Sequence, residues 1–111
     1  MDVNPESLVR PELETGVPGG RELLVFSDTV LGSDLGALNR ARELLADVLG
    51  PAAVTAATVT AAAFSKNDRI ANGCGISINP MAMKLMGDIR EQLGLNEFRS
   101  AENTLRFMRA E

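Results

Sequence analysis

The residues of the chain that could do chemistry gather in one stretch, Phe64 to Pro80, which reads FSKNDRIANGCGISINP. It holds an acid–base pair, Asp68 and Arg69, and the single cysteine of the chain, Cys74. A thiolate is favoured near a helix N-terminus or beside a cation, whereas Cys74 follows the predicted end of a helix, where the dipole disfavours an anion. We therefore expect Cys74 to be a small packing residue in a tight loop. The alternative is a nucleophilic thiol supported by Arg69.

Asp68 and Arg69 are adjacent in sequence, and adjacent residues do not face each other on a helix. Each is therefore expected to pair with another element, with Arg69 as a structural anchor that donates to carbonyls or to a carboxylate. An anion-binding role for Arg69 is the alternative, because a guanidinium suits both tasks. The glycines beside Cys74 do not form a phosphate-binding loop, since that fingerprint requires glycines that open a helix.

The chain contains no histidine. Its absence excludes Ser-His-Asp and Cys-His catalysis, zinc motifs that use histidine, and the Glu-x-x-His iron sites of helical bundles. Asp88 and Glu91 lie one turn apart and would bind a hard cation only weakly, so a solvated face is expected there. Met81, Met83 and Met86 recur at helical spacing and are expected to fill a core or an oligomer surface. We expect no metal and no cofactor.

The composition is that of an ordinary globular protein of 111 residues, with 45% apolar and 23% charged residues. Eleven basic residues are scattered among fifteen acidic ones, for a net charge of −4. This pattern lacks the basic face of nucleic-acid-binding proteins. No stretch has the roughly 20 apolar residues of a membrane span, and none at the N-terminus reads as a signal peptide. We expect a cytoplasmic protein that binds neither nucleic acid nor membrane.

Hydrophobic periodicity and turn signals predict an all-α fold, a small bundle of about five helices. Residues 1–20 contain three prolines and the turn TGVPGG, so they are expected to form an N-terminal arm with at most one helical turn, near Pro5 to Val9. Residues 21–111 are expected to form a single α-helical domain. The predicted helices lie within residues 21–32, 33–50, 51–73, 80–94 and 97–111.

Local signals set the ends of these helices. Gly50 can end the second helix, and Gly73 is expected to end the third in the left-handed cap conformation. Asn79 followed by Pro80 predicts the start of the fourth, and Asn96 is expected to cap the last. The third helix is the longest, and its first half is apolar or small on every side, so we expect it at the centre of the bundle.

The segment TVTAAAFSKNDRIANGCGI resembles the alkylhydroperoxidase-D-like superfamily, which includes the carboxymuconolactone decarboxylases. In that family a long apolar helix ends in Phe, three variable residues, Asn-Arg, an aliphatic residue, Ala, Asp, two variable residues, Gly and an aliphatic residue. Asp68 stands where Asn is usual, and Asn72 where Asp is usual. The resemblance covers roughly residues 21–78, and the matching residues of the phrase are Phe64, Arg69, Ile70, Ala71, Gly75 and Ile76.

This resemblance implies helix hairpins whose core is usually completed between subunits. The redox members of the family carry an upstream Glu and a Cys-x-x-Cys followed by His, and neither motif occurs in these 111 residues. We therefore expect a non-catalytic or reduced relative that acts in oligomerisation or in binding a protein partner. The alternative is a cofactor-free enzyme, either a peroxide-reducing thiol protein using Cys74 or a lactone- or acid-transforming enzyme using Asp68 and Arg69. A small acidic regulator of a larger enzyme is a third possibility.

Overall fold

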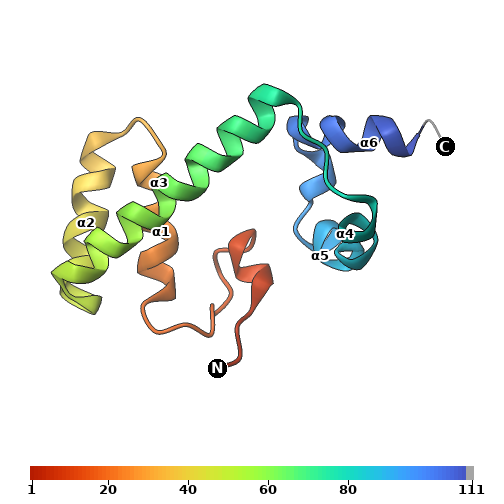
Figure 1. Cartoon of the computed structure of the whole chain (residues 1–111). Helices are drawn as coiled ribbons and strands as arrows, with labels where there is room; N and C mark the ends of the chain where they lie inside the picture. The colour runs from red at the N-terminus through yellow and green to blue at the C-terminus, as the bar shows by residue number, and fades with distance from the viewer. Residues whose placement is uncertain (110–111) are drawn as a thin grey trace. The chain divides into compact units, whose positions relative to one another are not determined.

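A computed structural model of the chain describes residues 1–109, which form helices and no strand. The predicted all-α fold is therefore confirmed, with six α-helices among the described residues where about five were expected. Contacts group the chain into two compact units, Met1–Ser65 and Lys66–Glu111. The elements, in which η marks a 3₁₀-helix, are η1 (Pro5–Leu8), α1 (Gly20–Val30), α2 (Leu35–Leu49), α3 (Pro51–Cys74), α4 (Pro80–Leu85), α5 (Gly87–Gln92), η2 (Leu95–Glu97), η3 (Arg99–Ala101) and α6 (Glu102–Met108) (Figure 1).

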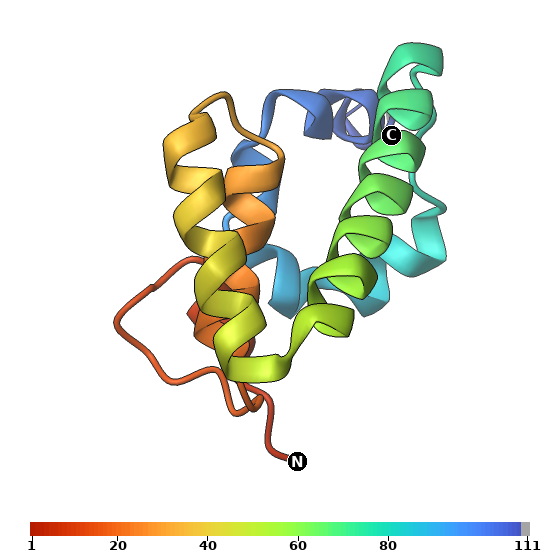
Figure 2. The same cartoon turned by 90° about the vertical axis from the view of Figure 1, so that its left-hand side faces the viewer.

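The first unit is built on a hairpin of α1 and α2, which lie side by side in both views (Figures 1 and 2). Phe26 of α1 and Leu45 of α2 are fully buried in it, together with Ala41. The start of α2 is fixed by Asp34, whose Oδ1 accepts a hydrogen bond of 2.9 Å from the amide of Ala37. Burial of these side chains against each other supplies the main stabilisation of the hairpin.

Helix α3 follows directly, because Gly50 adopts a positive φ of 91° that turns the chain between α2 and α3. Only Val54 and Ala57 of α3 pack against the hairpin core, and none of the 24 residues of α3 is buried. The expectation that α3 lies at the centre of the bundle is therefore wrong for the described chain. An apolar sequence predicts burial against some partner, and the hairpin covers only one side of this helix.

The N-terminal arm also folds onto the first unit. Its predicted turn near Pro5 is confirmed as η1. The amide of Asn4 donates to the carbonyl of Thr15 at 2.9 Å, and Arg21 Nη2 donates to the carbonyl of Leu13 at 2.6 Å. The second bond joins the arm to the first turn of α1, so the arm is fixed by polar contacts that its sequence did not indicate.

In the second unit, the left-handed cap of α3 lies two residues later than predicted. Gly75 has the left-handed φ of 66°, whereas Gly73 continues the helix, so the prediction for Gly73 is wrong. The amide of Ile76 bonds the carbonyl of Ala71 at 2.9 Å, and that of Gly75 bonds the carbonyl of Asn72 at 3.2 Å. This pair of bonds is a Schellman motif.

The helix predicted over residues 80–94 is divided into α4 and α5. It starts as expected, with Asn79 Oδ1 accepting from the amide of Met81 at 2.8 Å and Pro80 at the first helical position. Met86 leaves helical geometry, with φ −100° and ψ 13°, immediately before Gly87. Glycine weakens a helix interior, which explains why the division occurs here.

The first testable prediction concerns the hairpin core. Leu45→Ala should lower the free energy of unfolding by about 2–5 kcal/mol, because it leaves a cavity beside Phe26. The matched control is Leu44→Ala on the same helix, where the side chain is 56% exposed, and a change within about 1 kcal/mol is expected. Urea unfolding followed by circular dichroism measures both. Equal losses at the two positions would contradict this assignment of the core.

Candidate functional site

The three residues that the sequence singled out lie on the surface of α3. Cys74 is its last residue and is exposed. Asp68 and Arg69 are also exposed, and neither forms a hydrogen bond or ion pair within residues 1–109. The predictions of a packed Cys74 and of an anchoring Arg69 are therefore wrong. Both side chains lie on the exposed side of this end of α3, whereas Asp68 and Asn72 lie beside the rest of the second unit.

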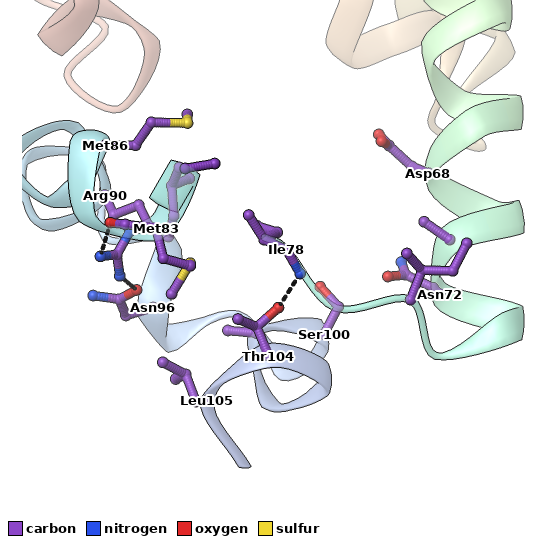
Figure 3. Close-up of a pocket in the computed structure, with 15 residues that line it drawn as sticks. Asp68, Asn72, Ile78, Met83, Met86, Arg90, Asn96, Ser100, Thr104 and Leu105 are labelled. Carbon is purple, nitrogen blue, oxygen red and sulfur yellow. Dashed lines mark hydrogen bonds between the residues drawn. The ribbon is translucent and has the colours of Figure 1, made fainter. Parts of the chain in front are cut away.

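The structure instead places a cavity of about 310 Å³ in the second unit. Asp68 and Asn72 of α3 border one side of it, and Arg90 and Asn96 border the opposite side (Figure 3). Most of its remaining lining is apolar, including Ile78, Ala82, Met83, Met86, Leu95 and Leu105. An apolar cavity with a few polar groups is the usual form of a small-molecule site.

Arg90 is the polar centre of this unit. Its Nη1 donates to Asn96 Oδ1 at 2.7 Å, and its Nη2 donates to the carbonyl of Met83 at 2.6 Å. The side chain thereby joins α4, α5 and η2. Its Nε is buried without a hydrogen-bond partner. Asn96 is thus a hydrogen-bond partner of Arg90 and does not cap the last helix as predicted.

A hydrogen bond to α6 holds the segment between α3 and α4. The amide of Ile78 donates to Thr104 Oγ1 at 2.8 Å, and Thr104 on α6 is buried (Figure 3). Because this hydroxyl oxygen accepts from the amide, its own hydrogen remains available to a further acceptor. Both ends of the bond border the cavity.

Asp88 and Glu91 were expected to form a solvated face, and both are exposed. Within the described residues, no group of three or more acidic or cysteine side chains could hold a metal ion. Met83 is buried and serves as core filler, whereas Met81 and Met86 are exposed. The role of core filler is therefore confirmed for Met83, and an oligomer surface at Met81 and Met86 stays a prediction.

A second candidate feature is the outer face of α3 in the first unit, formed by Ala52, Ala56, Val59 and Ala63. At 100° per residue these four residues form one stripe on the side opposite Val54 and Ala57. All four are exposed, and Val59 has 63% of its surface accessible. We call this set the outer stripe of α3.

Sequence reasoning missed Arg90, Asn96 and Thr104. One signal could have helped, since Gly87 inside the helical pattern of residues 80–94 marks a possible break. A break there turns α5 back on α4, which is what allows Arg90 to reach the carbonyl of Met83. The pairing with Asn96 and the burial of Thr104 depend on tertiary contacts and carry no local signal.

Comparison of the chain with protein-family models, with curated proteins and with solved structures finds no match. Among the helices of residues 1–109, none combines the length and apolar character that a membrane crossing requires.

The exposure of Cys74 gives the second testable prediction. Because Cys74 is exposed, Cys74→Ser should change the free energy of unfolding by no more than about 0.5 kcal/mol. The native protein should also react with one equivalent of a thiol reagent without prior unfolding. Urea unfolding and a colorimetric thiol assay measure the two. A thiol that reacts only after denaturation would place Cys74 in a core.

Proposed function

We propose that this protein is a non-catalytic helical module that associates with a second copy of itself through the outer stripe of α3. It would be a reduced relative of the alkylhydroperoxidase-like proteins that its sequence resembles. The observation that carries the proposal is the amount of surface that the single chain leaves exposed.

The accessible surface of the chain is 8157 Å². A compact monomer of its mass, 11.8 kDa, exposes about 5,900 Å². If the two units are treated as separate compact domains, the expected accessible surface rises only to about 7,100 Å². At least about 1,000 Å² is therefore in excess, and a standard interface buries about 800 Å² per partner. This excess supports association of the chain with a second copy.

The exposed side chains are of the kind that interfaces cover. Only four apolar residues are classed as buried in the described chain: Phe26, Ala41, Leu45 and Met83. Monomeric proteins seldom expose a large contiguous apolar surface. In the first unit alone, large apolar side chains are exposed at Leu31, Leu35, Leu44, Val48, Val59 and Phe64.

The outer stripe is suited to pack against the α3 helix of a second copy. Its residues are spaced by four, three and four positions, which is the spacing of a helix–helix seam. Three of the four are alanines, so two helices could approach closely. No charged residue stands in the stripe, and a stripe that packs on itself gives a closed two-fold dimer. We therefore infer a second copy of the chain as the occupant.

The enzymatic alternative has less support. Within residues 1–109, Cys74, Asp68 and Arg69 form no hydrogen bond or ion pair with one another, and a thiol mechanism needs a base or cation that activates the thiol. The family resemblance agrees with the proposal, because it implies helix hairpins whose core is completed between subunits.

The third testable prediction is that the wild-type protein is a dimer or higher oligomer at micromolar concentration. Val59→Glu should weaken the association at least tenfold, or about 1.4 kcal/mol, because it places a charge in a desolvated seam. Its matched control is Thr60→Glu, which introduces the same charge one position away and off the stripe, and little change is expected. Both substitutions suit a helix. Light scattering coupled to size-exclusion chromatography measures the mass.

Two results would overturn the proposal. A wild-type monomer at micromolar concentration would remove its basis. Equal weakening by Val59→Glu and Thr60→Glu would show that association does not use the outer stripe.

A further inference from the structure

We propose that the cavity of the second unit binds a small monocarboxylate with an apolar tail, with its carboxylate at Arg90. This inference is independent of the proposed self-association. It rests on the charge of Arg90, on the donors beside it and on the apolar lining of the cavity.

The Arg90 guanidinium is a half-buried cation without an anion. Its two hydrogen bonds go to neutral oxygens, the amide of Asn96 and the carbonyl of Met83. Within residues 1–109, no carboxylate lies within ion-pair distance of it. Its Nε–H is buried and unpartnered. Removing a charged group from water without a counter-charge is costly, and a carboxylate is an acceptor that a guanidinium binds strongly, often through two parallel hydrogen bonds.

Neighbouring side chains offer further hydrogen-bond donors to the carboxylate of the ligand. The Asn96 side chain carries an amide nitrogen that donates, and the Thr104 hydroxyl has a hydrogen left after accepting from Ile78. Asp68 is the one acidic residue in the lining, and it lies on the side opposite Arg90 (Figure 3). The charges therefore place the carboxylate at the Arg90 side and direct the tail away from it.

The rest of the cavity fits an apolar tail. Met83, Met86, Ile78 and Leu105 line it, and methionine side chains adapt to different shapes. A volume of about 310 Å³ is at the lower end of the range for ligand sites, about 300–1,000 Å³. A short- or medium-chain acid is therefore the class that fits, and a large cofactor does not.

The fourth testable prediction uses sodium octanoate, added to the full chain and followed by amide NMR shifts. Saturable shifts should appear around Ile78, Arg90 and Thr104. Octanol has the same tail without the charge, and acetate has the charge without the tail. Each should bind at least tenfold more weakly than octanoate, because each satisfies only part of the site.

Two variants separate headgroup from tail. Arg90→Leu should weaken octanoate binding at least tenfold, and the matched control Arg99→Leu, which removes an exposed arginine outside the cavity, should change it less than twofold. Ala82→Leu should also weaken binding at least tenfold by filling the cavity from α4. Because Arg90 joins three elements, its variant could unfold the second unit. In that case, Ala82→Leu and the octanol comparison carry the test.

Three outcomes would overturn the inference. Equal binding of octanol and octanoate would show that Arg90 provides no headgroup site. Shifts spread over the first unit, or shifts that do not saturate, would show general adsorption. Unchanged binding in folded Ala82→Leu would place the ligand outside this cavity. None of these outcomes depends on the oligomeric state, so failure here is distinguishable from failure of the proposed self-association.

Discussion

Burial of Phe26 and Leu45 between α1 and α2 is the contact on which the first unit depends. These two are the largest side chains that the structure buries fully, and partly buried residues from α1, α2 and the start of α3 surround them. From α3, Val54 and Ala57 pack against this core. A core this small leaves most of α3 in water, and that cost is the physical reason for expecting a partner.

The second unit also has a small apolar core, and polar contacts hold its elements together. Its helices are short, since α4 and α5 have six residues each. Short helices form few internal hydrogen bonds and depend on tertiary contacts. Arg90 and Thr104 provide these contacts by bonding backbone groups of other elements. An arginine used in this way keeps its charge, and this charge at the edge of an apolar cavity is what gives the cavity a preference among ligands.

The two proposals follow from incomplete packing within each unit. The first unit leaves apolar helix surface uncovered, which favours a protein partner. The second unit leaves a cavity beside a cation, which favours a small amphipathic anion. Neither requires histidine, a metal or a reactive thiol, and the chain has no histidine and a single, exposed cysteine, Cys74.

The sequence by itself determined the helical class, the position of the longest helix and the start at Asn79, because these depend on periodicity and on cap side chains close in sequence. It did not determine whether Gly73 or Gly75 takes the left-handed turn, because both positions satisfy the local rule. Composition likewise indicated that α3 should be buried, but only the tertiary structure decided which of its faces finds a partner within the chain. The site was decided in the same way: Arg90 and Asn96 are six positions apart, Ile78 and Thr104 twenty-six, and their pairing follows from how α4, α5 and α6 pack. The chemistry of each side chain can be read from the sequence, whereas the side chains that meet in a site are decided by how the helices pack.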